Sequence, residues 1–191
     1  MSHKAEDESG RAIRWIRSDF TVMMVMVLIL FLADGPVRAA KDKPIDLELV
    51  LALDMSSTVH LLDFDLQRRG FADAFRHPDV IAAIRSAGSK GIAVAMVQWA
   101  NQKTQTLAMD WTLVHDKASA AALADKIERT PRLVPGGSTA LHGAIRFSLK
   151  QLAENGFAGR RKVIDISGDG GIAWGPRPRQ ERDKAIALGV T

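Results

Sequence analysis

The strongest constraint on the fold is a short apolar segment that ends abruptly in polar residues. Residues 47–53 read LELVLAL, and Asp54 follows directly, ahead of Ser56 and Thr58. An apolar run of this length is typical of a strand buried on both faces, which occurs mainly in parallel sheets covered by helices. The segment therefore predicts a central parallel strand that runs into a polar loop.

The rest of the chain alternates between helix and strand patterns. Helical spacing of apolar residues predicts helices over 61–84, 120–127, 141–152 and 179–188, with Gly88 as the stop of the first. Further strands are expected at 92–99, 163–166 and, as a half-exposed edge strand, 107–111. This order predicts an α/β fold, a doubly wound and mostly parallel sheet with helices on both faces. Ligands of such sheets bind beyond the carboxyl ends of the strands.

The last predicted helix is followed by Gly189, Val190 and Thr191 alone. A further strand is expected to start here, because a helix of such a sheet packs against the strand that follows it. The sequence therefore predicts a domain truncated at its C-terminus, which lacks one strand and one helix. A chain extended by about 30 to 50 native residues is expected to be more soluble and more stable.

The first 40 residues have the pattern of a targeting segment. Three arginines precede an apolar run over 20–33, and Gly35-Pro36 and Ala39-Ala40 follow it. The run is shorter than the roughly 20 residues that cross a bilayer. Residues 1–40 are therefore expected to be a signal peptide, with an uncleaved anchor in the inner membrane as the alternative. Residues 41–191 are expected to form one exported domain, periplasmic or secreted.

Composition excludes several classes of protein and site. The chain has no Cys, which excludes disulfides, thiolate zinc sites and cysteine nucleophiles. It is 47% hydrophobic and 25% charged, which is typical of a globular domain. Its net charge of +4 is spread along the chain without interleaved aromatic residues. Nucleic acid is therefore not an expected partner.

Three polar segments stand in an order that suits a metal site. They are Asp54-Met55-Ser56-Ser57-Thr58, then Gly136-Gly137-Ser138-Thr139, and then Ser167-Gly168-Asp169-Gly170. Hydroxyl and carboxylate oxygens are the hard ligands that Mg²⁺ prefers. Two carboxylates would balance a divalent charge, and neutral hydroxyls would leave the ion electrophilic. An acidic residue of a partner could then replace a bound water.

These segments resemble the metal-ion-dependent adhesion site (MIDAS) of von Willebrand factor A (VWA) domains, which has the pattern Asp-x-Ser-x-Ser, then Thr, then Asp. The resemblance covers about residues 46–191. The phrases DLELVLALD, DFDLQRRGF, WTLV and VIDISGDG are more closely similar to a family of secreted bacterial A-domain-like proteins, a domain of unknown function. The resemblance implies a Rossmann-like VWA fold and a metal held by Asp54, Ser56, Thr58, Thr139 and Asp169.

Within this resemblance the hydroxyls would bind the metal directly, and one or both carboxylates would act through water. Thr58 stands where Ser is usual, and it keeps the hydroxyl that coordination needs. Each residue also has a purely structural interpretation. Asp54 could cap a turn, 56–58 could cap the following helix, Thr139 could cap the helix near Leu141, and Asp169 could be a turn residue.

Other candidate chemistry is weaker. The five histidines show no H-E-x-x-H spacing and are expected to be solvated or packed, although His142 lies one helical turn beyond Thr139. The chain has no G-x-S-x-G elbow, and residues 136–139 lack the lysine of a phosphate-binding loop. Neither nucleophilic nor phosphate-loop chemistry is therefore expected.

The expected function is that of an exported adhesion or binding module with no catalytic activity. It would use Mg²⁺, with Mn²⁺ or Ca²⁺ as alternatives, to hold a carboxylate of a partner protein, and it would meet a membrane only through an uncleaved N-terminal segment. One alternative is a haloacid-dehalogenase-like, Mg²⁺-dependent phosphatase, whose Asp-x-Asp-x-Thr loop and Gly-Asp-Gly are similar to segments of this chain. Ser56 stands where that enzyme has its general acid, and it cannot act so near neutral pH. A structural VWA module with a decayed metal site is the third interpretation.

Overall fold

The computed structural model describes residues 42–168 and 178–191. The strands in these ranges are β1 (Lys43–Asp54), β2 (Ile92–Trp99), β3 (Gln105–Val114) and β4 (Phe157–Ser167). The helices are α2 (Leu61–Arg76), α3 (Pro78–Ala87), α4 (Lys117–Arg129), α5 (Leu141–Ala153) and α6 (Pro178–Ala187). None of these helices combines the length and the apolar character that crossing a bilayer requires.

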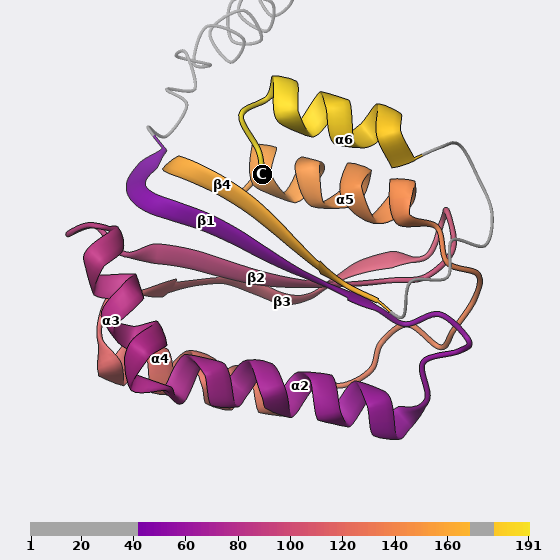
Figure 1. Cartoon of the computed structure of the whole chain (residues 1–191), viewed down its shortest axis with the longest axis horizontal. Coiled ribbons are helices and arrows are strands. Elements are labelled where there is room, and N and C mark those ends of the chain that lie inside the picture. The colour runs from indigo at the N-terminus through magenta and orange to yellow at the C-terminus, as the bar shows by residue number, and fades with distance from the viewer. Residues whose placement is uncertain (1–41, 169–177) are drawn as a thin grey trace, which may run out of the picture. The chain divides into compact units, whose positions relative to one another are not determined.

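The strands form one sheet in the order β3-β2-β1-β4 (Figure 1). β1 is parallel to both β2 and β4, and β3 is antiparallel to β2. At the carboxyl end of β1, Asp54 pairs with Trp99, and Leu53 pairs with Ser167. The three parallel strands therefore end at the same edge of the sheet, and the predicted mostly parallel α/β fold is confirmed.

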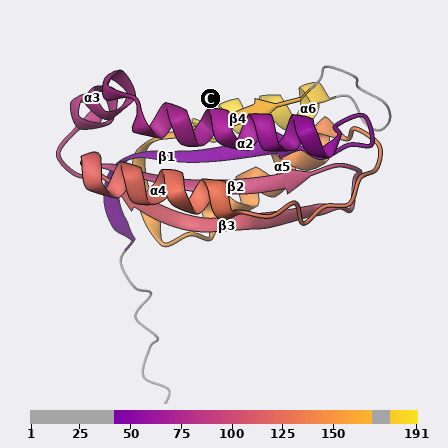
Figure 2. The same cartoon turned by 90° about the horizontal axis from the view of Figure 1, so that it is seen from below.

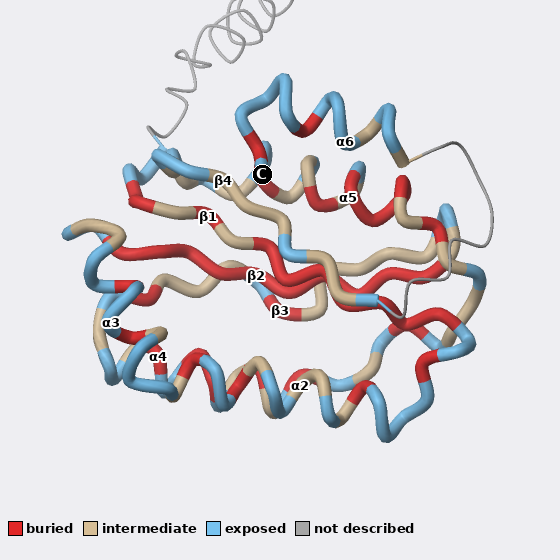
Figure 3. The backbone as a smooth tube through the Cα atoms, in the orientation of Figure 1, coloured by how far each residue is buried: buried red, intermediate tan, exposed pale blue. Residues whose placement is uncertain are grey.

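Helices cover both faces of this sheet. α5 and α6 lie on one face, and α2, α3 and α4 lie on the other, where α2 and α4 run side by side (Figures 1 and 2). Side chains of β1 alternate between the two cores. Leu51 and Leu53 pack with the α2 and α4 layer, and Val50 and Ala52 pack with the α5 layer. Burial on both sides explains the continuous apolar run of β1. β2 is likewise buried along its whole length, as Figure 3 shows.

The helical pattern predicted over 61–84 forms two helices instead of one. α2 ends at Arg76, and α3 begins at Pro78. His77, between them, has extended backbone angles of φ −69° and ψ 134°. A proline disfavours the helical conformation of the residue before it, while its own fixed φ suits the first turn of a helix. Pro78 therefore breaks the run and starts the second helix.

β1 and β4 are longer than their apolar runs predict, because residues 43–45 pair with residues 157–159, and this end of the sheet also buries a charged residue. Glu48 is fully buried, and its carboxylate accepts hydrogen bonds from Asn155 Nδ2 and from the Gly159 amide, both at 2.6 Å. Lys162 Nζ lies 3.7 Å away. A Cβ at position 159 would stand only 2.7 Å from Glu48 Oε1. Glycine there lets the start of β4 close over this carboxylate.

The end of the described chain lies beside β4. Val190 forms a parallel bridge with Lys162. The Thr191 amide donates to Lys162 O at 3.0 Å, and the Ile164 amide donates to Thr191 O at 2.8 Å. Strand pairing therefore begins where the sequence predicts a further strand, on the side of β4 that faces away from β1.

We expect Glu48→Ala to lower the free energy of unfolding by about 2 to 3 kcal/mol, because it removes a buried acceptor and leaves two half-buried donors, Asn155 Nδ2 and the Gly159 amide, without their partner. Urea denaturation measures this change. The matched control is Glu154→Ala, which removes an exposed carboxylate 3.9 Å from Lys150 and should cost less than about 0.5 kcal/mol. Equal losses in the two variants would contradict the assigned role of Glu48.

Candidate functional site

Two of the three predicted polar segments lie in direct contact at the carboxyl edge of the sheet. They are the β1–α2 loop and the segment between α4 and α5. The Ser57 amide donates to Gly137 O at 2.9 Å, and the Gly137 amide donates to Ser57 Oγ at 3.1 Å. This reciprocal pair joins loops that are 80 residues apart in the chain.

The first segment gathers a carboxylate and two hydroxyls. Asp54 is fully buried at the end of β1, and its Oδ1 accepts a hydrogen bond from the Ser56 amide at 2.7 Å. Ser56 Oγ lies 3.1 Å from Thr58 Oγ1. Ser56 is buried and Thr58 is exposed, so this oxygen cluster extends from the interior to the surface. Asp54 thus orders the turn, as its structural interpretation predicts, and also contributes charge at this position.

The third segment approaches the same carboxylate. A Cβ at Gly168, the residue after β4, would lie 3.3 Å from Asp54 Oδ2. The predicted ligand Asp169 is the next residue, and it lies outside the described residues. Within 42–168 and 178–191, no group of three or more His or acidic residues is arranged to hold a metal ion. A site here would therefore depend on hydroxyl oxygens as well as carboxylates, which suits a hard cation.

The capping alternatives for the hydroxyl residues do not apply. α2 has His60 as its N-cap, and the His60 amide donates to Asp63 Oδ2 at 2.9 Å. α5 has Ala140 as its N-cap and no side-chain capping bond. The hydroxyl groups of 56–58 and Thr139 are therefore not used to cap these two helices.

Two glycines bring the second segment close to the first. Gly136 and Gly137 have φ values of +143° and +144°, which side chains other than glycine rarely adopt. A Cβ at Gly136 would lie 3.3 Å from Ser57 Oγ, and one at Gly137 would lie 3.1 Å from Asn101 Nδ2. Ser138 and Thr139 follow, and the Ala140 amide donates to Ala100 O at 2.9 Å. The glycines thus bring the segment before α5 against the β1–α2 loop.

Arg132 was not predicted, yet it holds the two loops together. Its Nη1 donates to Val59 O at 2.7 Å, and its Nη2 donates to Met55 O at 3.0 Å, both in the β1–α2 loop. Its Nε donates to Val134 O at 3.0 Å, in its own segment. No feature of the sequence around Arg132 indicates these long-range contacts.

Gln98 anchors the same segment to the sheet. It is fully buried in β2, its Nε2 donates to Pro131 O at 2.8 Å, and its Oε1 accepts from the Leu133 amide at 2.7 Å. A lone amide side chain within the apolar run 92–99 is the signal that could have identified it, since buried polar groups need partners.

His142 belongs to the core and not to this oxygen cluster. Its side chain on α5 is only 3% exposed. It lies one helical turn beyond Thr139 in the chain. Its Nε2 has no hydrogen-bond partner among the described residues. This placement agrees with the expectation that the histidines are solvated or packed.

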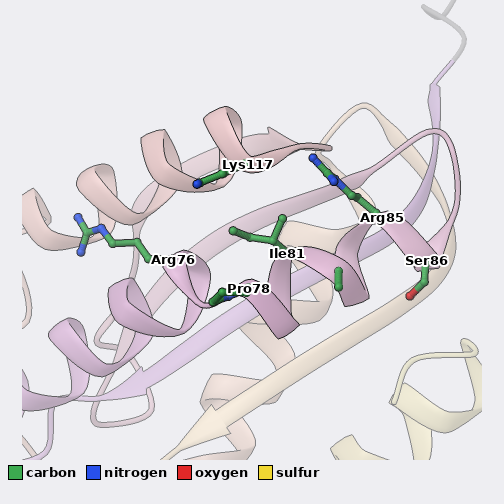
Figure 4. Close-up of a pocket in the computed structure, with 7 residues that line it drawn as sticks. Arg76, Pro78, Ile81, Arg85, Ser86 and Lys117 are labelled. Carbon is green, nitrogen blue, oxygen red and sulfur yellow. The ribbon is translucent and has the colours of Figure 1, made fainter.

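A cavity of about 620 Å³ lies away from the predicted site, where α2 and α3 approach the start of α4 (Figure 4). Arg76, Arg85 and Lys117 contribute cationic side chains to its lining. Arg76 donates to Glu128 at 2.7 Å and to Asp125 at 2.6 Å, and these bonds raise the pKa of Arg76. Its charge is therefore already compensated by the protein, and the cavity adds no ligand to the oxygen cluster.

We expect Arg132→Met to loosen both loops, because three hydrogen bonds are lost while the sheet stays intact. Amide exchange over 55–59 and 133–137 should become faster, and the free energy of unfolding should fall by about 2 kcal/mol. Hydrogen exchange measured by mass spectrometry tests this. Arg129→Met, which removes an exposed arginine at the end of α4, is the control and should leave these amides protected. Equal exchange in the two variants would contradict the role of Arg132.

The fold resembles solved structures of VWA domains. Proximal thread matrix protein 1 (PTMP1) from the mussel byssus matches with a TM-score of 0.59 and 17% identity over 80% of this chain. Its structure with a zinc-occupied MIDAS motif gives a TM-score of 0.60 and 18% identity. The chain spans 38% of the length of that protein. The vWF domain of the type V pili tip protein Mfa5 from Porphyromonas gingivalis matches at 16% identity and a TM-score of 0.43, over 69% of this chain and 39% of that one.

At these identities the matches show the fold alone, and the VWA-like fold implied by the sequence resemblance is confirmed. No curated protein matches the chain. A family described as "Protein of unknown function (DUF1194)" matches residues 44–191, which include every described strand and helix except the first residue of β1. On this match the chain belongs to the DUF1194 family, and its domain has the fold of a VWA domain.

Proposed function

We propose that the chain is a metal-dependent binding module that holds an acidic group of a partner protein. The observation that carries the proposal is the buried carboxylate of Asp54 beside the paired hydroxyls of Ser56 and Thr58. These groups lie at the carboxyl edge of a parallel sheet, where α/β folds bind their ligands. Carboxylate and hydroxyl oxygens grouped in this way are ligands that suit a hard divalent cation.

The proposed ligands are three hydroxyl residues and two acids: Ser56, Thr58, Thr139, Asp54 and Asp169. Mg²⁺ suits these oxygens best, with Mn²⁺ or Ca²⁺ as alternatives. Such an ion supplies a Lewis-acidic centre at which a carboxylate can replace a water. PTMP1, which has a similar fold, was solved with zinc in its MIDAS motif. That occupancy supports a metal at the corresponding loops of this chain.

Binding fits the residues better than hydrolysis does. A phosphatase of the haloacid-dehalogenase type would need an acidic group where Ser56 stands, and a serine hydroxyl does not donate a proton readily near neutral pH. Ser56 Oγ is also engaged with Thr58 at 3.1 Å. The matched mussel protein is named as a matrix protein, which is in keeping with a binding role.

We place this module outside the cytoplasm, in the periplasm or secreted medium. The support is the pattern of residues 1–40, with arginines before a short apolar run and small residues after it. An uncleaved anchor in the inner membrane is the alternative. In both cases, the domain would meet partners on the exported side.

We expect Mg²⁺ to stabilise the protein and Asp54→Asn to abolish that effect. Asparagine keeps an oxygen that can accept from the Ser56 amide, so the turn survives while the charge is lost. At a concentration 100 times Kd, a bound ion adds about 2.7 kcal/mol. Thermal melts in Mg²⁺ and in chelator measure the gain. Asp165→Asn, an exposed acid on β4, is the control that should respond as the wild type does.

An identical melting temperature in Mg²⁺ and in chelator would refute the metal site and favour a structural module without metal. A gain in both Asp54→Asn and Asp165→Asn would place the ion elsewhere in the chain.

We expect no metal-dependent hydrolysis of 4-nitrophenyl phosphate, because no general acid stands at position 56. Absorbance of the released nitrophenolate, with Mg²⁺ present, measures turnover. Hydrolysis that persists in Asp165→Asn and disappears in Asp54→Asn would replace the binding proposal by the phosphatase.

A further inference from the structure

A second cavity, of about 530 Å³, lies directly beside the oxygen cluster. We name it the Leu61–Leu133 pocket. Its lining includes Val59, His60, Leu61, Arg132, Leu133 and Pro135. These residues come from the β1–α2 loop, the first turn of α2 and the segment between α4 and α5. The pocket is therefore built from the same two loops that carry the proposed metal ligands.

One residue belongs to both features. Ser57 lines the pocket, and it stands between the proposed ligands Ser56 and Thr58. Its amide and hydroxyl are bonded to Gly137, which fixes its position. A ligand group at the oxygen cluster would therefore have its neighbouring atoms at the mouth of this pocket.

The pocket exposes apolar side chains that folding alone would favour burying. Leu61 is 68% exposed, and Leu133 is 51% exposed. Leu62 and Leu66 on α2 are also exposed, but they do not line the pocket. Scattered exposed leucines are ordinary, but leucines from two segments far apart in the chain that line one cavity are typical of an interaction surface. The pocket therefore suits a bulky apolar side chain.

The pocket also carries a positive charge. The guanidinium of Arg132 donates to the main-chain carbonyls of Met55, Val59 and Val134. In the described part of the chain, no carboxylate forms an ion pair with it. A partner with negative charge near its apolar group would meet complementary charge here.

We infer that this surface recognises a partner segment in which an acidic residue is flanked by a bulky apolar residue. The acidic side chain reaches the metal, and the apolar side chain enters the Leu61–Leu133 pocket. This inference rests on the proposed function, since the metal sets where the acidic group lies. Side chains of an extended peptide alternate between its two faces, so the flanking apolar residue lies two positions from the acid, about 7 Å along the chain, and both side chains point to this surface.

The test uses fluorescein-labelled hexapeptides with one Asp and with Leu, Phe or Ser two positions from it, on a Gly-Ser background. Fluorescence anisotropy with Mg²⁺ measures Kd for each peptide. Peptides flanked by Leu or Phe should bind about tenfold more tightly than the Ser-flanked peptide, as burial of one apolar side chain implies. In Leu61→Ser and Leu133→Ser, this preference should fall below about threefold.

Leu66→Ser is the matched control, because Leu66 is 73% exposed on α2 and does not line the pocket. It should keep the full preference. The three substitutions replace exposed side chains, so their melting temperatures and Mg²⁺ response should match those of the wild type. That response confirms that the fold and the metal site are intact in each variant.

Equal affinity for Leu-flanked and Ser-flanked peptides would overturn the inference and leave the metal-dependent binding module standing. Absence of peptide binding while Mg²⁺ still stabilises the chain would overturn it too. Binding of phosphatidylcholine vesicles that Leu61→Ser and Leu133→Ser abolish would assign the pocket to a lipid surface instead. If the wild-type chain neither binds the peptides nor is stabilised by Mg²⁺, the proposed function itself is refuted.

Discussion

Burial of β1 on both faces is the constraint on which the rest of the structure depends. A strand enclosed by two neighbours and two helical layers can carry charged side chains only where the protein supplies partners. β1 carries three buried acids, and each is hydrogen-bonded: Asp46 by the Lys90 and Gly91 amides, Glu48 by β4, and Asp54 by the Ser56 amide. Asp46 and Glu48 accept these hydrogen bonds in the amino-terminal half of β1. The third, Asp54, lies at the carboxyl edge, where the β1–α2 loop meets the segment between α4 and α5.

Most of the fold could be predicted from the sequence because its signals are local. The run 47–53 predicted a strand buried on both faces, and the apolar spacing over 141–152 predicted α5. The break at Pro78 is a local signal as well, but the apolar spacing that continues on both sides of it obscured it. The extra length of β1 and β4 was not predictable, because residues 43–45 and 157–159 pair with each other across more than 100 residues of chain.

The candidate site also has residues that the sequence predicts and residues that it does not. The acid and hydroxyls at 54–58 and the glycines before Thr139 could be identified, since their types and spacing suit a hard cation. Arg132 and Gln98, which hold the loops in place, act through main-chain atoms of distant residues. Main-chain carbonyls are the same for every residue type, so the sequence has no pattern that pairs them with a given side chain. The Leu61–Leu133 pocket depends on those contacts, so it could not be predicted from the sequence either.

The strand order has a consequence for the time course of folding. β1 is the first described strand, and its parallel neighbour β4 pairs Phe157 with Lys43. More than 100 residues must therefore be synthesised before this edge of β1 has its hydrogen-bonding partner. Closing so long a loop costs entropy before any contact repays it. Until then, β1 lacks the neighbour on one of its two edges, and the pairing that completes the sheet is delayed. A chain that is exported unfolded would gain from this delay, because its central strand cannot be completed early.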